Sequence, residues 1–176
     1  DTLEFNNGSS IYVSVSFRSG TLQYLHISEY GKICAKFPER AKEINTGATE
    51  SVAQWGYVFI ESTAEGKQGD FYDKTIEAQK LKSEWKVLNP LEYKFFFFAW
   101  HEVEEYRVYD DHLVLSQETK DYFRILKDDE HIECDEAQMK WWQLKKKDLK
   151  EDMFREYPSY PDEAFKVSVE WSYYST

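Results

Sequence analysis

The sequence has no phosphate-cradling loop of the form G-x-x-x-x-G-K-S/T. Gly66-Lys67 comes nearest to this pattern. It fails because Glu61 stands where the first glycine is needed and Gln68 replaces the Ser or Thr. We therefore expect no complete nucleotide site of the P-loop kind within this stretch of sequence.

Cysteine is scarce as well. Cys34 and Cys134 are the only two, and neither lies in a C-x-x-C pair or near a pair of histidines. A zinc site is therefore not expected, and two reduced thiols in a cytosolic protein are the better interpretation. No candidate base lies near either cysteine in sequence, so thiol catalysis has little support.

Long hydrophobic runs are missing. The longest, Phe95–Trp100, is far shorter than the about 20 residues that a membrane-spanning helix needs, and it is typical of a central strand. We therefore expect no membrane association.

Positive charge is outnumbered, with 22 Lys and Arg against 33 Asp and Glu and a formal net charge of -11. An acidic surface disfavours general affinity for nucleic acids, so any DNA contact would be local. The best local candidate is the basic run of Lys140, Lys145–Lys147 and Lys150. A solvated helix face explains such a run more often than a phosphate contact does.

Aromatic residues, in contrast, make up 18% of the 176 residues, which is enough apolar area for one domain with a sizeable core. Turn signals and periodicity predict a hairpin over 1–17, strands over 22–28, 57–60 and 92–99, helices over 38–44, 70–83, 116–127 and 135–149, and a short helical piece up to Gln54. Two prolines within 157–161 are expected to end the helical region. Strands that alternate with helices predict an α/β fold, in which helices cover both faces of a mostly parallel sheet.

Two predicted strands end abruptly in polar residues. One ends in Ser28 and Glu29, and the other continues into Ser62-Thr63-Ala64. Because ligands bind at the carboxyl edge of a parallel sheet, we expect both groups at one edge. Glu29 is a candidate general base that orients water towards a γ-phosphate, although a surface acid at a strand end explains it better when it is taken alone. Ser28 could place a hydroxyl or a water molecule near Mg²⁺, where an aspartate is more usual.

Two further groups have both a functional and a structural interpretation. Arg18, in a turn near Gly20, is a candidate arginine finger, and Ser62 and Thr63 could hydrogen-bond a γ-phosphate. A solvent-exposed turn and a strand end are the commoner explanations. The acidic clusters at 102–105, 110–111 and 128–130 favour solvated loops, although a metal-dependent enzyme stays open.

A set of short sequence motifs favours the functional interpretations over the structural ones. In order, they are Asn7–Ser9, Arg18–Thr21, Leu25–Glu29 with Gly31-Lys32, Phe37–Ile44 ahead of Gly47, Ile60–Gly66 with Phe71-Tyr72, Phe97–Trp100, Glu136–Gln138 with Trp141-Trp142, and Glu156–Ser159 with Glu163–Phe165. In this combination and order, the chain resembles the large terminase subunit of tailed bacteriophages, the ATP-driven DNA-packaging motor. The resemblance covers nearly the whole chain.

The resemblance implies a partial P-loop (ASCE-type) ATPase fold and a role for each candidate residue. Glu29 would be the catalytic glutamate of the Walker B position, and Ser28 would stand where the metal-associated aspartate usually does. Ser62-Thr63-Ala64 would be the coupling motif, and Arg18 would reach the ATP of a neighbouring subunit. ATP and Mg²⁺ would be the cofactors.

The resemblance also implies an organisation and partners. Residues 1–165 would be the C-terminal portion of the ATPase domain without its Walker A loop, and 166–176 would begin the linker to a nuclease domain. The chain begins at Asp1 without an initiator methionine, so we expect a fragment. Because it lacks the Walker A loop and the nuclease domain, we expect it to be inactive alone. The implied partners are double-stranded phage DNA, the small terminase subunit, the portal protein and further copies in a ring, in the cytoplasm of the bacterial host.

Two other functions stay open from the sequence. The chain could be a non-catalytic prophage remnant or interaction module that retains the fold. It could also be an unrelated acidic enzyme that uses a carboxylate cluster and a metal.

Overall fold

The computed structural model describes residues 1–15 and 20–166. The chain divides into two units: the first comprises Asp1–Ser62 and Gly69–Phe71, and the second comprises Thr63–Gln68 and the chain from Tyr72 onward. Each unit has a hydrophobic core of its own.

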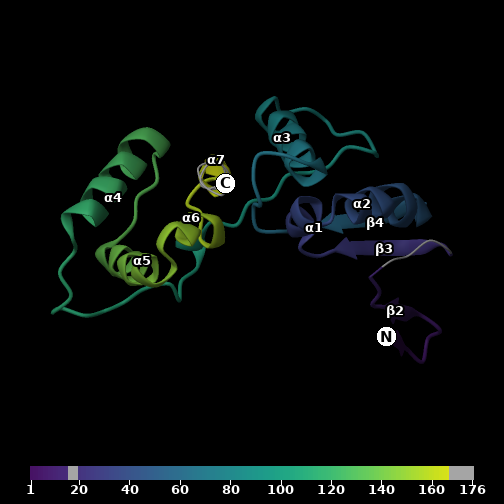
Figure 1. Ribbon diagram of the computed structural model, residues 1–176, viewed down its shortest axis with the longest axis horizontal. Helices are drawn as coiled ribbons and strands as arrows, with labels where there is room; N and C mark the ends of the chain where they lie inside the picture. The colour runs from purple at the N-terminus through teal and green to yellow at the C-terminus, as the bar shows by residue number, and fades with distance from the viewer. Residues whose placement is uncertain (16–19, 167–176) are drawn as a thin grey trace, which may run out of the picture. The chain divides into compact units, whose positions relative to one another are not determined.

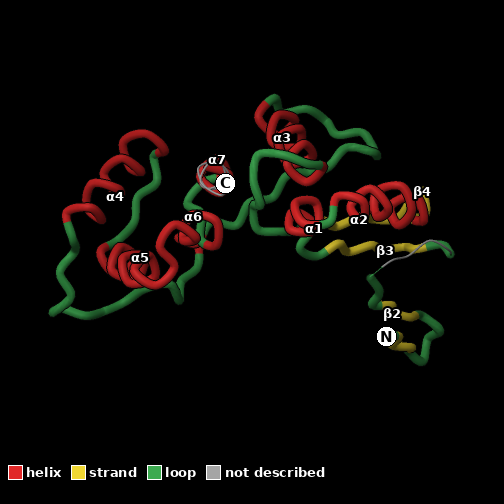
Figure 2. Tube along the Cα trace, in the orientation of Figure 1, coloured by secondary structure: helices red, strands yellow, loops and turns green. Residues whose placement is uncertain are grey.

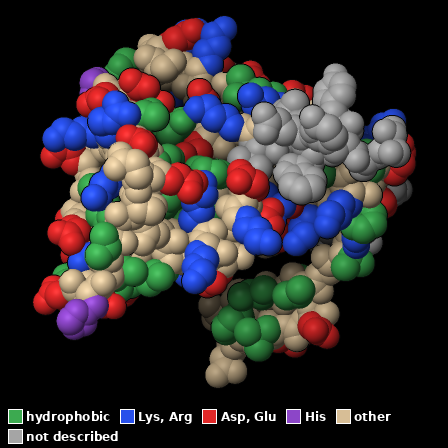
Figure 3. Space-filling model, turned by 60° about the vertical axis from the view of Figure 1, so that its left-hand side comes forward, with side chains coloured by type: hydrophobic (Ala, Val, Ile, Leu, Met, Phe, Trp, Pro, Cys, Tyr) green, Lys and Arg blue, Asp and Glu red, His purple; other side chains and the backbone are tan. Residues whose placement is uncertain are grey.

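The first unit opens with an antiparallel hairpin of β1 (Thr2–Glu4) and β2 (Ser10–Tyr12), in which Leu3 pairs with Ile11. Gly8 adopts φ 81° in the turn, a left-handed conformation that glycine accepts without strain. The predicted N-terminal hairpin is therefore confirmed, although the end of its expected range lies outside the described residues. Hydrophobic side chains lie on its surface, at the bottom of Figure 3.

A parallel pair of strands forms the centre of the first unit. β3 (Leu22–Ile27) pairs with β4 (Val52–Ile60), and the last register pair is Ile27 with Ile60. α1 (Tyr30–Lys36) and α2 (Pro38–Glu43) lie along one side of the pair in Figure 1. A core of Ile27, Tyr30, Cys34 and Ala41 joins these helices to the strands.

The opposite face of β3 and β4 is rich in exposed aromatic side chains. Tyr24 and Tyr57 stack with ring centroids 5.8 Å apart, and Phe59 stacks on Tyr57 at 6.4 Å. All three are more than half exposed, at 68%, 60% and 54% for Tyr24, Tyr57 and Phe59. The alternation of side chains along a strand accounts for this, because residues two apart share a face.

Several predicted boundaries in the first unit differ from the structure. α1 was not predicted, and the helical piece expected up to Gln54 ends earlier, as a π-turn at Ile44–Ala48 and a 3₁₀-turn at Thr49–Ser51. β4 begins at Val52, earlier than the predicted start at Tyr57, and Gly56 allows the strands to approach closely along it. A Cβ at Gly56 would meet the backbone oxygen of Gln23 at 2.6 Å.

The second unit is mainly helical. Its helices are α3 (Asp70–Ser83, from Tyr72 onward), α4 (Gln117–Glu130), α5 (Glu136–Leu149), α6 (Met153–Glu156) and α7 (Pro161–Lys166), with short 3₁₀-turns at Trp100–Glu102 and Lys150–Asp152. Trp141 stacks on Tyr106 at 4.4 Å and Trp142 on Tyr122 at 4.3 Å, so aromatic pairs fill much of this core. Many of the aromatic residues of the sequence pack in this core.

Two predictions for the second unit are wrong. Residues 92–99 form no strand and run as an extended loop (Figure 2), in which Phe96 and Phe98 are exposed. No strand among the described residues pairs with this segment. Strand propensity alone does not make a strand, because a strand needs a neighbour for its backbone hydrogen bonds. The helical region also continues past Pro158, because Pro161 begins α7 at a position where proline is favoured.

The architecture is therefore α/β, with a small parallel sheet flanked by helices and an N-terminal antiparallel hairpin. Within residues 1–15 and 20–166, no helix is both long and apolar enough to cross a membrane.

Candidate functional site

Glu29 occupies a left-handed turn directly after β3. Its backbone has φ 56° and ψ 35°, a conformation that costs a non-glycine residue about 1 kcal/mol or more. It stands at the N-cap of α1, yet its side chain makes no capping hydrogen bond and is exposed, as is Ser28. The turn therefore presents the Glu29 carboxylate to solvent at the strand end, where it is accessible to a ligand.

Two backbone hydrogen bonds tie the end of β3 to the end of β4. The Glu61 amide donates to the Ile27 oxygen at 3.1 Å, and the Tyr30 amide donates to the Glu61 oxygen at 3.2 Å. The sequence prediction that Glu29 and Ser62 follow neighbouring parallel strands at one edge therefore agrees with the observed register. Thr63 and Ala64 follow in the chain and belong to the second unit.

Ser62 carries a buried hydroxyl that has no hydrogen-bond partner among the described residues. A buried polar atom left unpaired costs about 1 to 3 kcal/mol, so each such atom calls for an explanation. Thr63 is half-buried and Ala64 is buried.

His26 and Glu61 form a pair on the aromatic face of the strands. His26 Nε2 lies 3.4 Å from Glu61 Oε1, and the two side chains are 61% and 53% exposed. No role for His26 was predicted from its sequence context. Such an exposed contact contributes little to stability. It does place a second carboxylate beside the edge that carries Glu29.

Tyr30 is the residue of this region that sequence reasoning missed. Its side chain is 1% exposed, and its hydroxyl lies 2.8 Å from Asp70 Oδ2 and 3.2 Å from the Ala41 oxygen. Burial, with the Asp70 carboxylate beside it, raises the pKa of the Tyr30 phenol. Its position directly after the polar strand end was the only available signal, and helix α1 itself was not predicted.

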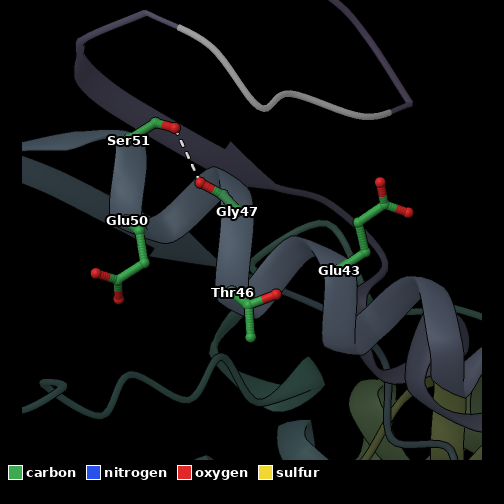
Figure 4. A pocket seen from close by; sticks show the side chains of 5 residues that line it. All are labelled: Glu43, Thr46, Gly47, Glu50 and Ser51. Atoms are coloured by element: carbon green, nitrogen blue, oxygen red, sulfur yellow. Dashed lines mark hydrogen bonds between the residues drawn. The ribbon is translucent and has the colours of Figure 1, made fainter.

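A separate hollow lies on the turns between α2 and β4 (Figure 4). Its lining residues are Glu43, Thr46, Gly47, Glu50 and Ser51. The Ser51 hydroxyl donates to the Gly47 oxygen at 2.9 Å, and the Thr46 hydroxyl donates to the Lys42 oxygen at 2.9 Å. Both hydroxyls serve the local backbone, and none of the candidate residues from the sequence lines this hollow.

The remaining candidates have different outcomes. Arg18 lies outside the described residues. In the basic run, Lys140 pairs with Glu136 at 2.7 Å, while Lys146 lies over the Phe154 ring at 4.6 Å and pairs with Glu118 at 3.1 Å. Lys140 and Lys146 therefore contact residues of their own unit, as expected for a helix face that packs on its neighbours.

No group of three His, Cys, Asp or Glu side chains in the described part of the chain is arranged to hold a metal ion. The ends of β3 and β4 offer an exposed carboxylate, that of Glu29, and a buried hydroxyl, that of Ser62. Nothing in the sequence provides a glycine-rich cradle for the phosphates of a nucleotide.

Comparisons with known protein families, with curated proteins and with solved structures found no match. A function for this chain is therefore inferred from its own residues and their geometry.

Proposed function

We propose that this chain is part of the ATPase of a bacteriophage DNA-packaging motor, a large terminase subunit, and carries its hydrolytic acid and coupling motif. The observation that supports it most is the parallel pairing of β3 with β4, which ends at Ile27 and Ile60. In this pairing, the family-like phrases that contain Glu29 and Ser62 follow adjacent strand ends.

Within this proposal, Glu29 orients the attacking water, and Ser62-Thr63-Ala64 respond to the loss of the γ-phosphate. Arg18 is proposed as the arginine finger presented to a neighbouring copy. ATP supplies the phosphoryl group whose hydrolysis drives movement, with Mg²⁺ near Ser28. Double-stranded DNA, the small subunit and the portal protein are the proposed partners, in the bacterial cytoplasm.

The chain alone is proposed to be inactive, because it has no phosphate cradle. The test uses the native reading frame that contains this sequence, expressed in full, with DNA-stimulated ATP hydrolysis as the readout. Glu29→Gln should lower kcat by about 10²-fold or more, the usual contribution of a general base. Arg18→Ala should lower it by about 10³-fold. Unchanged rates in both variants would remove the site assignment.

An interaction module that keeps the fold without catalysis is the second candidate. The exposed aromatic face of Tyr24, Tyr57 and Phe59 favours it, because large exposed apolar patches mark binding surfaces. The upstream reading frame separates the two functions. A G-x-x-x-x-G-K-S/T sequence before Asp1 supports the motor, and a start codon at that boundary supports the module.

A further inference from the structure

Tyr30 contacts the two ends of one segment of the chain. Residues 61–69 join β4 to α3, and we refer to them as the connecting segment. At its start, the Tyr30 amide donates to the Glu61 oxygen at 3.2 Å. Directly after its end, the Tyr30 hydroxyl lies 2.8 Å from Oδ2 of Asp70, the first residue of α3. One residue therefore bonds to both ends.

The surroundings hold Tyr30 in this position. Its ring meets Phe71 edge to face, with centroids 6.5 Å apart, and its side chain belongs to the core with Ile27 and Cys34. The hydroxyl also lies 3.2 Å from the Ala41 oxygen, so the bonds of the phenol are made inside the unit. A fully buried side chain fixed in this way transmits a shift of its backbone to its partners, because interiors are close-packed.

The connecting segment bends sharply at its far end. Gly69 has φ 89° and Gly66 has φ 97°, both in the left-handed region that glycine adopts readily. The chain leaves the first unit after Ser62 and returns at Gly69, and within the second unit Glu65 lies 3.8 Å from Arg155. Tyr30 thus contacts Glu61, at the start of the connecting segment, and Asp70, directly after its end.

We propose that Tyr30 is a positioning residue that holds the connecting segment in register with Glu29. Because Tyr30 directly follows Glu29, a change in the Glu29 turn moves the Tyr30 amide and hydroxyl together. Their partners, Glu61 and Asp70, move with them, and so do the two ends of the segment that contains Ser62-Thr63-Ala64. The effect of this link on catalysis rests on the proposed function. The link itself is a property of the folded chain.

Hydrogen exchange of the 176-residue chain, without nucleotide, tests the link. Tyr30→Phe removes one hydroxyl, and Tyr24→Phe makes the same change at an exposed tyrosine. We expect Tyr30→Phe to speed exchange of amides 62–70 by about tenfold, to leave 53–60 unchanged, and Tyr24→Phe to have no effect. Unchanged exchange at 62–70, or equally faster exchange throughout the first unit, would overturn the proposal.

A second pair of variants approaches the same bond from Asp70. Asp70→Ala should speed exchange of 62–70, and Asp70→Asn, which keeps an acceptor oxygen, should restore the slow rate. The double variant Tyr30→Phe/Asp70→Ala should speed exchange there by less than the combined effects of the two single variants, since both remove the bond between Tyr30 and Asp70. Additive effects would contradict the link. If Tyr30→Phe fails to fold, the comparison of Asp70→Ala with Asp70→Asn tests the link without it.

The functional consequence is measured separately in the full-length protein. Tyr30→Phe should lower kcat for DNA-stimulated ATP hydrolysis by about tenfold and leave KM for ATP unchanged, because it alters positioning and removes no nucleotide contact. Faster exchange in Tyr30→Phe combined with full activity in Glu29→Gln would retain the link and reject the ATPase. Normal exchange combined with an inactive Glu29→Gln would do the reverse.

Discussion

Ile27 and Ile60 are the last register partners of β3 and β4, and both side chains belong to the core beneath α1 and α2. Ile27 is 6% exposed. The same two residues lie at the ends of the strands, so the positions of Glu29 and Ser62 depend on apolar packing two residues upstream. Stability and site geometry are therefore linked in this unit.

Ile27→Ala should lower the free energy of unfolding of the first unit by about 2 to 5 kcal/mol, because it removes buried methyl groups and leaves a cavity. Phe59→Ala removes a larger side chain from the exposed face, where Phe59 is 54% exposed, and should cost less. Urea denaturation monitored by hydrogen exchange of β4 amides measures both. Equal losses would show that the aromatic face is buried in solution.

The sequence predicted the strand ends well because they carry a local signal. An apolar run that stops at Ser28 and Glu29 marks the end of β3, and the alternation of Tyr24 and Leu25 separates the two faces. The starts of α4 and α5 were predicted for a similar reason: the side chains of Ser116 and Asp135 cap the next helix, each accepting from the amide three residues on.

The rest depends on contacts between distant residues. Nothing in the sequence around Tyr30 indicates that its hydroxyl meets Asp70, 40 positions away. The strand expected at 92–99 has the right local pattern, yet a strand needs a neighbour, and the pattern does not specify one. Ser62 was named for its position, and its lack of a partner emerged only from the packing around it.

Glu163 should make the stability of the second unit depend on pH. Its side chain is 4% exposed, accepts from the Ser159 amide at 2.6 Å and from the Tyr122 hydroxyl at 2.8 Å, and has a pKa raised by burial above the ordinary 4.5. The folded chain then binds this proton more tightly than the unfolded chain. The contribution of Glu163 is complete below pH 4.5 and is lost as pH rises through its folded pKa.

The matched variant is Glu163→Gln, which cannot ionise. The unfolding free energy of the wild type minus that of Glu163→Gln should fall as pH rises from 4.5, and then level off. Urea denaturation at a series of pH values measures this difference, in which the other acids cancel. A difference that rises with pH would mean that the hydrogen bonds outweigh burial and that the pKa is lowered.

Cys134 should react slowly with alkylating reagents. Burial, together with the neighbouring Asp135 carboxylate, raises the pKa of its thiol to about 12 from the ordinary 9.0. Only the thiolate reacts, so at pH 8 the folded chain should be alkylated at Cys134 about 1,000-fold more slowly than the urea-unfolded chain. Peptide mapping by mass spectrometry separates this site from Cys34. Equal rates in the folded and unfolded chains would contradict the burial of the thiol.

Ser62 and Ser159 allow one substitution to be compared at an unpaired and a paired hydroxyl. Ser62 Oγ has no partner among the described residues, whereas Ser159 Oγ accepts from Trp100 Nε1 at 2.9 Å and lies 2.7 Å from the Tyr122 hydroxyl. Ser62→Ala removes a buried group that folding leaves unpaired, so it should raise the free energy of unfolding by up to about 1 kcal/mol. Ser159→Ala should lower it by about 1 to 3 kcal/mol, because it leaves the Trp100 donor unpaired.

Thermal and urea unfolding of the ligand-free chain measure both serine variants. If Ser62→Ala is more stable than the wild type, the chain tolerates an unpaired hydroxyl at the edge that carries Glu29, as proteins do where a site is kept ready for a ligand. Under the proposed function, the same variant in the full-length protein should lose DNA-stimulated ATP hydrolysis while gaining stability. A destabilised Ser62→Ala would mean that the hydroxyl is already paired in the free protein, which would contradict the prediction.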